Sequence, residues 1–284
     1  MAAHTRSSSA GRGPARGTLA CALAIGGLDP GGGAGIAADL RGFVAAGAFG
    51  CAALAVLTVQ STAGLKSVRS LPARELTAQS MEVMRHQRVR AVKVGALGGR
   101  DNVRAVAALL AKYPGVPSVV DTPIAPTRGR GKARLLAEGA LGAMRDALLP
   151  RATLVTANLD EVQALLGERV RTVGEAHDAA RALTALGARA ALVKGGHMEG
   201  ANAIDVLAVD GEVYELRARR LAIPPMHGSG CTFASLIAGR LAVRATTRIE
   251  TEDLVAAIRW AKKIHHAALA RTVDVGDGLR VIVF

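Results

Sequence analysis

Short apolar runs alternate with segments of helical periodicity along the chain from Thr18 onward. Runs of this kind, bounded by glycine, proline or polar residues, are typical of buried strands in a parallel sheet. We expect such strands at Leu19 to Ile25, Cys51 to Val59, Val89 to Val94, Ser118 to Val120, Leu154 to Thr156 and Ala190 to Val193. An Asp-Gly hairpin should follow, pairing Val206 to Val209 with Val213 to Leu216.

The segments between these runs carry apolar residues at helical spacing. After the first strand, Ile36, Leu40 and Phe43 fall on one face of a helix. Further helices are expected at Glu75 to Met84, from a cap at Asp101 to about Tyr113, at Gly230 to Val243 and at Thr251 to Ala270. The alternation of strand and helix predicts an α/β fold with a largely parallel sheet.

The composition is that of a globular protein with a core of small side chains. Of the 284 residues, 50% are hydrophobic but only 2% are aromatic, so Ala, Leu and Val must build the core. No linker divides residues 18–284, which we expect to form one domain. Residues 1–17 are rich in Ser, Gly and Arg and have no apolar segment, so we expect a disordered basic leader there and no secretory signal.

The formal net charge of +13 would suit nucleic acid, a membrane surface or an anionic small molecule. The basic residues after the leader are scattered among Asp and Glu, and few aromatic side chains exist to stack on bases, so we do not expect a nucleic-acid partner. We expect no membrane partner, because no apolar stretch is long enough to span a bilayer. Three cysteines without paired spacing indicate a reduced, cytoplasmic protein: Cys21, Cys51 and Cys231.

The glycine-rich sequence HGSGCT at 227–232 lies directly before an apolar helix. Backbone N–H groups of Gly228, Ser229 and Gly230 should converge at the helix N-terminus, where partial positive charge attracts a phosphate or a developing oxyanion. A tight turn without a ligand is the alternative. Cys231 stands in the first helical turn, where a thiol pKa is lowered, although a buried and inert cysteine is the commoner case.

A second glycine-rich turn, GGLDPGGGAG at 26–35, joins the first strand to its helix. Asp29 and Pro30 interrupt the G-x-G-x-x-G fingerprint of dinucleotide sites, and the Gly-Lys-Ser/Thr sequence of a P-loop is missing. The Asp29 carboxylate suits a hydroxyl or amino group of a small ligand better than a phosphate.

Polar residues follow several of the expected strands, and open parallel sheets bind ligands at the carboxyl ends of their strands. Asp121, Asn158 and Lys194 occupy such positions. Asn158 and Glu161 could offer oxygen ligands to Mg²⁺ or cap a helix, and both readings stay open. Lys194 could meet a phosphate as a point charge. The remaining histidines have no ligand spacing and are interpreted as structural: His197, His265 and His266.

With these pieces in order, the chain resembles the hydroxymethylpyrimidine and phosphomethylpyrimidine kinases of thiamin biosynthesis, a branch of the ribokinase-like superfamily. The resemblance covers about Leu19 to Ala270 and keeps the order of seven motifs. They are GLDPGGGAGIAADL at 27–40, GCAALAVLTVQST at 50–62, KVGAL at 93–97, VVD at 119–121, TANLDE at 156–161, LVKGGH at 192–197 and HGSGCT at 227–232. The resemblance implies a three-layer α/β/α ribokinase-like fold with a central, mostly parallel sheet.

The resemblance also implies an activity: transfer of a phosphoryl group from ATP, with Mg²⁺, to hydroxymethylpyrimidine and then to its monophosphate. On this chain, Gly228, Ser229 and Gly230 would form the anion hole and Cys231 would accept the hydroxyl proton. Lys194 would steady the transferring group. Further roles carried over by the resemblance are substrate contacts at Gln60, Asp29, Ala34, Asp39 and Gly27, and Mg²⁺ and phosphate contacts at Glu161, Asp121 and Asn158. Homodimers are common among such kinases, so we expect one here.

Several residues depart from the family pattern, and they gather around the expected pocket and its flap. They include Leu28, Gly31, Ala96, Thr122, Pro123, Thr127, Arg128 and Met226. These changes bear most on the second phosphorylation, because the flap closes over the substrate.

Two other functions stay open. Pyridoxal or pyridoxine kinases share the architecture, but the polar Gln60 disfavours that substrate. A catalytically silent sensor of the pyrimidine phosphate is the other alternative, and the retention of Cys231, Lys194 and Glu161 argues against it.

Overall fold

The structure, a computed structural model, describes residues 19–124, 134–137, 139–196, 198–244 and 249–284. The expected leader at 1–17, the altered pair Thr127 and Arg128, and His197 lie outside these ranges. Within the described ranges, no helix combines the length and the apolar character that crossing a membrane requires.

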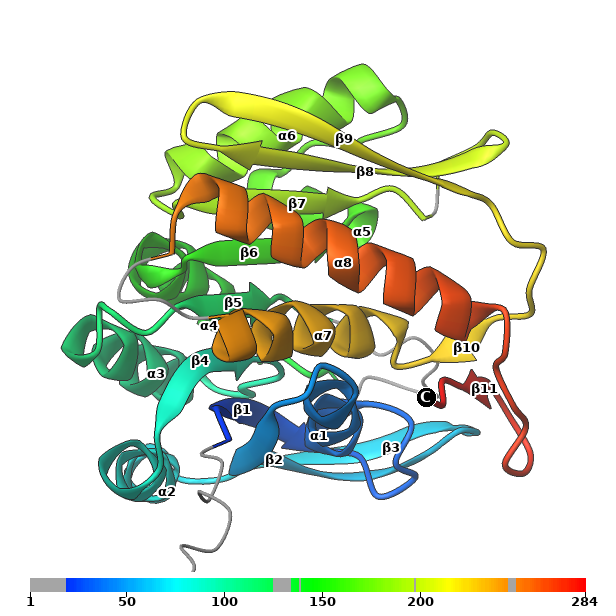
Figure 1. The fold of residues 1–284 in the computed structure, drawn as a ribbon. Coiled ribbons are helices and arrows are strands. Elements are labelled where there is room, and N and C mark those ends of the chain that lie inside the picture. Colours follow the sequence, from blue (N-terminus) through cyan, green and yellow to red (C-terminus); the bar gives the residue numbers. More distant parts are fainter. Residues whose placement is uncertain (1–18, 125–133, 138, 197, 245–248) are drawn as a thin grey trace, which may run out of the picture.

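A nine-stranded sheet runs through the middle of the molecule in the order β3-β2-β1-β4-β5-β6-β7-β8-β9 (Figure 1). The parallel strands are β2 (Phe49–Ser61), β1 (Cys21–Leu28), β4 (Val89–Val94), β5 (Ser118–Asp121), β6 (Leu154–Asn158) and β7 (Ala190–Lys194). Antiparallel strands form the two edges, namely β3 (Gly64–Ser70) on one side and β8 (Asn202–Val209) with β9 (Glu212–Arg219) on the other. The mostly parallel α/β sheet that the sequence predicts is confirmed.

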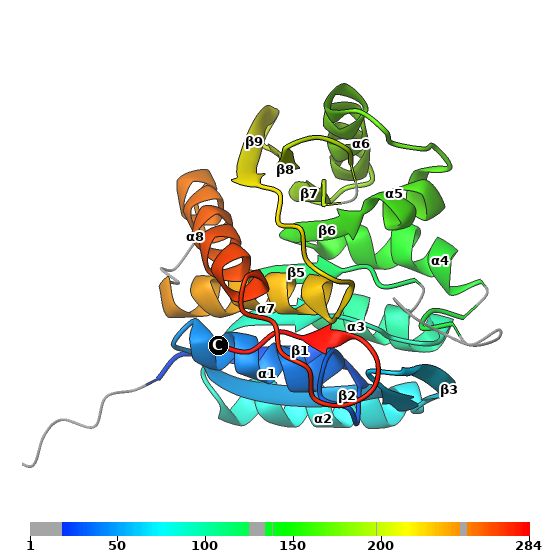
Figure 2. The ribbon, with the colours of Figure 1, turned by 90° about the vertical axis from the view of Figure 1, so that its right-hand side faces the viewer.

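Helices cover both faces of the sheet and complete the expected three layers (Figure 2). One face carries α1 (Gly35–Ala45), α7 (Ser229–Arg244) and α8 (Thr251–Leu269), and the other carries α2 (Ala73–His86), α3 (Arg100–Lys112), α5 (Leu159–Leu166) and α6 (Val173–Ala185). Successive residues of β1 pack on opposite faces, as the two-residue period of a strand requires. Ala22 and Ala24 belong to the core beneath α7, whereas Leu23 and Ile25 belong to the core beneath α3.

The connections show where local sequence rules succeed and fail. The hairpin of β8 and β9 turns at Asp210 and Gly211, whose φ angles of 48° and 86° confirm the expected Asp-Gly turn. The expectation that Asp101 caps α3 is wrong, because Gly99 is the N-cap and Asp101 lies inside the first turn. There its negative charge still interacts favourably with the partial positive charge at the helix N-terminus.

Two further groups of short elements complete the described chain. Between β5 and β6 lie α4 (Ala140–Ala143), a π-helical turn η1 (Met144–Leu148) and a 3₁₀ turn η2 (Leu149–Arg151). A separate pair of parallel strands, β10 (Met226–His227) and β11 (Arg280–Val281), holds the end of the chain beside the glycine-rich turn that precedes α7. His227 thereby enters that turn from a fixed backbone.

Candidate active site

A cavity of about 800 Å³ opens at the carboxyl ends of the parallel strands. Its wall includes residues from β1, β2, β5, β6 and β7, together with the start of α7. This is the edge at which parallel sheets bind ligands. The cavity brings together all of the predicted site residues, which are Gly27, Asp29, Ala34, Asp39, Gln60, Asp121, Asn158, Glu161, Lys194, Gly228, Ser229, Gly230 and Cys231.

The turn before α7 has the geometry of an anion site. Gly228 adopts a left-handed φ of 75°, and a Cβ at this position would overlap the Gly33 carbonyl, so only glycine fits. Ser229 begins α7, and Gly35 begins α1 on the same side of the sheet. Two helix N-termini therefore direct unpaired N–H groups and partial positive charge at the same end of the cavity.

Cys231 stands in the first turn of α7, as expected, but its acidity is the opposite of the prediction. Burial raises the pKa of the Cys231 thiol to about 11, and the charge of Lys93 and an N–H of Gly35 only partly oppose this shift. The expectation of a lowered thiol pKa is therefore wrong, because desolvation outweighs the helix start. Cys231 is a neutral thiol at pH 7 in the free protein.

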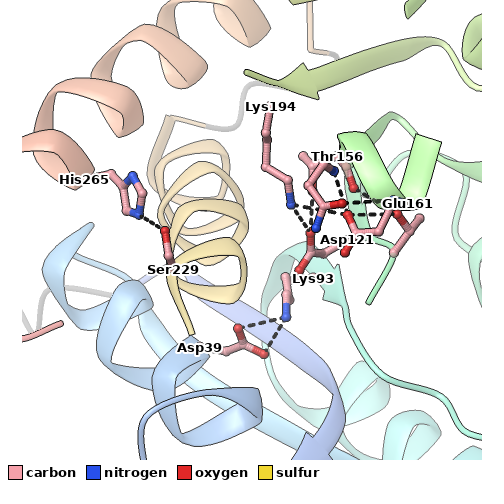
Figure 3. A network of polar contacts seen from close by, with 10 residues as sticks. Asp39, Lys93, Asp121, Thr156, Glu161, Lys194, Ser229 and His265 are labelled. Carbon is pink, nitrogen blue, oxygen red and sulfur yellow. Dashed lines mark hydrogen bonds and ion pairs between the residues drawn. The ribbon is translucent and has the colours of Figure 1, made fainter. Parts of the chain in front are cut away.

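Beneath Cys231 lies an ion pair that the sequence analysis missed. Lys93 Nζ is 2.9 Å from both carboxylate oxygens of Asp39, and both side chains are fully buried (Figure 3). Burial raises the pKa of Asp39 to about 6, with Lys93 opposing the shift. Asp39 therefore reaches the cavity wall with its charge already paired. In the sequence, Lys93 is one lysine inside an apolar strand, and only its place in the KVGAL motif marks it.

Lys194 links two acids, Asp121 at the end of β5 and Glu161 in the first turn of α5. Its Nζ lies 2.9 Å from Asp121 Oδ1 and 3.7 Å from Glu161 Oε2 (Figure 3). Burial acts to raise the pKa of Asp121, but Lys194 and Lys93 outweigh it and hold that pKa below its usual range. Burial raises the pKa of Glu161 to about 7, against the opposing charge of Lys194. The three side chains form one buried group, in which the Glu161 carboxyl has the pKa nearest to neutral pH.

Asn158 and Glu161 form a capping box at the start of α5. Asn158 Oδ1 accepts from the Glu161 N–H at 2.9 Å, and Glu161 Oε2 accepts from the Asn158 N–H at 2.7 Å. Of the two readings left open by the sequence, the helix cap is therefore present. The amide oxygen of Asn158 is already engaged, whereas Glu161 keeps a second carboxylate oxygen for other partners.

Asp29 stabilises the turn to which it belongs through hydrogen bonds of its carboxylate. Its carboxylate accepts from the N–H groups of Gly31 (2.9 Å) and Ala34 (2.8 Å), and it lies 2.8 Å from His227 Nε2. Burial acts to raise the pKa of Asp29, but His227 and the two amides outweigh it and lower that pKa. Gln60 reaches the same ring nitrogen through its Nε2 atom at 3.1 Å. Asp29 thus fixes His227 and the turn. Gln60 is the member of this group that comes from β2.

The residues that depart from the family pattern fall into two groups. Leu28, Ala96, Pro123 and Met226 line the cavity. Thr122 is buried behind the wall, where its hydroxyl donates to the Thr156 carbonyl at 3.3 Å.

The cavity continues past Lys194 into a part that the sequence analysis did not foresee. This part is lined by residues of β8, β9, the segment before β10, and α8, among them Asp205, Arg219, Arg220, Ile223, Lys262 and His265. His265 stacks on Phe233 with ring centroids 5.1 Å apart, and its Nε2 is 3.2 Å from Ser229 Oγ. Burial lowers the pKa of His265 to about 3, so this ring is neutral. None of these residues belongs to a sequence motif, because they come from separate elements that only the fold brings together.

The donor set near Lys194 fits a magnesium ion held jointly with phosphates better than a metal held by protein alone. In the described part of the chain, no group of three or more His, Cys, Asp or Glu side chains is arranged around a metal position. Asp121 and Glu161 are two carboxylates on one wall of the cavity, and Mg²⁺ commonly binds one or two carboxylates together with water and substrate phosphates.

Comparisons with known proteins identify the family of this chain. The family model described as phosphomethylpyrimidine kinase matches residues 29–282. The hydroxymethylpyrimidine/phosphomethylpyrimidine kinase of Streptomyces coelicolor is 40% identical, with 90% of this chain and 91% of that protein covered. The Escherichia coli protein of the same name is 36% identical, with 91% and 94% covered.

Two solved structures show the same architecture. A Bacillus subtilis pyridoxal kinase, crystallised with ADP, superimposes with a TM-score of 0.82 at 28% identity, covering 93% of this chain and 97% of that one. A Clostridium difficile phosphomethylpyrimidine kinase superimposes with a TM-score of 0.71 at 27% identity, covering 86% and 99%. The fold is therefore ribokinase-like. Since the family model spans most of the chain and the relatives match along nearly their whole length, this chain belongs to the phosphomethylpyrimidine kinase family.

Proposed function

We propose that this protein is an ATP-dependent kinase that phosphorylates hydroxymethylpyrimidine and then its monophosphate, and that residues 18–284 act as one domain. The observation that carries the proposal is a single cavity that holds both Gln60 and the turn of Gly228 to Cys231. An amide can donate and accept hydrogen bonds in one plane, as an aminopyrimidine edge requires. The relatives of matching length are named for this reaction.

The phosphoryl group would transfer at the start of α7. Phosphoryl transfer depends mainly on positioning and on stabilising the charge of the equatorial oxygens. Backbone N–H groups of Gly228, Ser229 and Gly230 would bind those oxygens, and Lys194 would add a positive charge. A Cβ built on Gly230 would lie 3.2 Å from Lys194 Nζ, so the turn and the lysine are close enough to act on one group.

Cys231 would accept the proton of the substrate hydroxyl. Its thiol is neutral in the free protein, so it must lose its own proton before it can act as a base. A loose transition state requires little proton removal early in the reaction, so a scarce thiolate remains compatible with turnover.

Mg²⁺ would be held by Asp121 and Glu161 together with the ATP phosphates, and it would neutralise phosphate charge. Both acids now pair with Lys194. A phosphate that draws Lys194 toward itself would free their oxygens, so this chain's own residues can exchange partners without leaving a charge unpaired. The third Mg²⁺ contact expected from the sequence, Asn158, would act through its cap on Glu161.

A pyridoxal kinase is the second candidate, because the Bacillus subtilis pyridoxal kinase is a close structural neighbour with a TM-score of 0.82. Gln60 distinguishes the two substrates. Purified protein with MgATP should phosphorylate hydroxymethylpyrimidine, and the monophosphate assay decides whether the second step occurs. Turnover of pyridoxal alone would support the second candidate. Tight binding of the pyrimidine phosphate without turnover of any substrate would indicate a sensor.

The variant Gln60→Ala should raise KM for hydroxymethylpyrimidine by about 10-fold or more while changing kcat less, because a lost hydrogen bond to a substrate is worth about 1.5 kcal/mol. Gln87→Ala, at an exposed position after α2, is the matched control and should leave both constants unchanged. If Gln60→Ala changed KM no more than the control Gln87→Ala does, the role of Gln60 would be contradicted.

We also propose that the protein works as a homodimer in the cytoplasm. Its three cysteines are free, which suits a reducing compartment. Exposed apolar side chains gather where α1 and the end of α7 meet the start of β2, namely Leu19, Val44, Phe49 and Val243. Apolar groups that gather on a surface are typical of protein interfaces, and we assign this one to a second copy of the chain.

A further inference from the structure

The turn that follows Lys194 is held in place by one arginine, Arg220, which directly follows β9. Arg220 Nε donates to the Gly200 carbonyl at 2.8 Å, and Nη1 donates to the Gly196 carbonyl at 2.6 Å. Nη2 donates to the carbonyls of Met198 and Asn202. A guanidinium with its fixed fork of five donors can bind four carbonyls of one turn at once, whereas an ammonium cannot.

Backbone contacts and a second ion pair act on the same turn. The Arg220 N–H donates to the Ala201 carbonyl at 2.9 Å. The Gly195 N–H donates to Asp205 Oδ1 at 2.9 Å, and Asp205 Oδ2 pairs with Lys262 of α8 at 2.7 Å. The glycine pair after Lys194 and several described residues that follow it are thus tied to β8, to α8 and to the residue after β9.

Arg220 also differs from the lysines of the cavity in its charge. Lys93 pairs with Asp39, Lys194 with Asp121 and Glu161, and Lys262 with Asp205. Among the ion pairs found in the described residues, none includes Arg220, whose contacts there are neutral carbonyls. Arg220 lines the cavity, so its positive charge is available to an anionic ligand.

The position of Arg220 indicates which ligand it affects. In the sheet order, Gln60 lies on β2 and Arg220 follows β9, at opposite ends of the sheet. The helix α7 packs on β1, β4 and β5, which lie between β2 and β9 in the sheet. If the pyrimidine binds at the Gln60 end and its hydroxymethyl group meets the γ-phosphate at α7, the rest of the nucleotide must extend toward Arg220.

We propose that Arg220 is a positioning residue for the nucleotide: by binding the carbonyls of Gly196, Met198, Gly200 and Asn202, it sets the place of the Lys194-Gly195-Gly196 segment against the phosphates. This inference rests on the proposed function for the direction in which ATP lies. The fork geometry carries the effect, and the charge adds to it. Without Arg220, four carbonyls lose their donors and the turn loses its fixed shape.

The test compares three variants by ADP titration calorimetry and by steady-state kinetics. Arg220→Ala should weaken ADP binding and raise KM for MgATP by about 10-fold or more, since groups misplaced by a lost support cost that much, with KM for the pyrimidine within 2-fold of wild type. Arg220→Lys keeps the charge without the fork, so it should remain at least about 5-fold weaker than wild type. Arg217→Ala is the matched control, because Arg217 lies on β9 and, among the described residues, its side chain binds Glu215.

The outcomes separate this proposal from the proposed function. Full ADP affinity in Arg220→Lys would overturn the positioning role and leave a charge effect. An equal rise of KM for ATP and for the pyrimidine would overturn it as well. If Arg220→Ala unfolds early in a thermal melt, Arg220→Lys decides the question by itself. A wild-type protein that binds ADP but phosphorylates no pyrimidine would refute the proposed substrate, and the ADP comparison would still test Arg220.

Discussion

At the scale of single residues, the thiol of Cys231 has a pKa raised by burial to about 11. Only the thiolate can accept a proton. At pH values below that pKa, the thiolate fraction rises tenfold for each unit by which the pH increases. We therefore expect kcat to rise steadily between pH 7 and pH 10. Cys231→Ala should lower kcat at pH 8 by about 10²-fold or more and abolish this rise, with KM little changed. A flat wild-type profile would show that proton removal by Cys231 is not part of the slow step.

The buried pair of Lys93 and Asp39 belongs to the same scale. Lys93→Met would leave the Asp39 carboxylate buried without its partner, which costs about 3–5 kcal/mol in the free energy of unfolding. The double variant Lys93→Met/Asp39→Leu should recover most of that loss, because it removes both charges. Urea unfolding measures both changes.

A surface pair provides the control for that comparison. Arg181 and Asp178 on α6 are exposed and lie 3.7 Å apart, so Arg181→Met should change the free energy of unfolding by less than about 1 kcal/mol. Equal small effects in Lys93→Met and Arg181→Met would mean that Asp39 takes up a proton or water at little cost.

Single residues also show what the sequence could and could not predict. The turn before α7 was predictable, because glycines before an apolar helix have a direct structural meaning. The acidity of Cys231 was not, since the sequence places it at a helix start but does not reveal the desolvation that outweighs that position. Lys93 and Arg220 were missed because their partners lie far away in the sequence and no local pattern marks them.

At the scale of elements, the turn of residues 28–35 packs against the turn that joins β2 to β3. Gly31 is one of the residues that depart from the family pattern, and a Cβ there would lie 2.8 Å from Ser61 Cα, which is too close for the present backbone. Gly31→Ser should therefore displace this turn. Because Gln60 precedes Ser61, KM for the pyrimidine should rise by about 3- to 10-fold, with a smaller effect on KM for ATP.

A glycine in open space is the control for that substitution. Gly115 has no atoms within 4 Å of a built Cβ, so Gly115→Ser should leave both constants unchanged. An unchanged KM for the pyrimidine in Gly31→Ser would show that the two turns adapt without moving Gln60. The strand β3, which pairs with β2 after this turn, was not expected from the sequence. Its segment LKSVRS has too few apolar residues to indicate a strand. Its ladder with β2 determines it instead.

At the scale of the whole molecule, the fold was predictable because strand and helix patterns alternate regularly and the glycine-rich turns fall between them. The division of the cavity was harder to foresee. The half that contains Gln60 and the α7 turn comes from sequence motifs, whereas the half around Arg220 and His265 depends on how β8, β9 and α8 pack. That packing involves long-range contacts that no local pattern encodes.

The assembly is the last property that belongs to this scale. Val44 on α1 is 70% exposed and Phe49 at the start of β2 is 53% exposed, and Gly47 between them lies against Val243 of α7. A second copy of the chain would cover these side chains and remove apolar surface from water, at roughly 25 cal/mol for each Å². Val44→Asp would bury a charge in such an interface, so it should convert the dimer to a monomer at micromolar concentration in light scattering.

A valine elsewhere on the surface separates an interface effect from a general effect of charge. Val275 is 60% exposed in the segment between α8 and β11, outside the proposed interface, and Val275→Asp should leave the molar mass unchanged. The side chains of the proposed interface are not among those that line the cavity, so the Val44→Asp monomer should keep most of its kcat. A wild-type protein that is monomeric at the same concentration would refute the dimer, and loss of activity together with dissociation would mean that the second copy supports the active site.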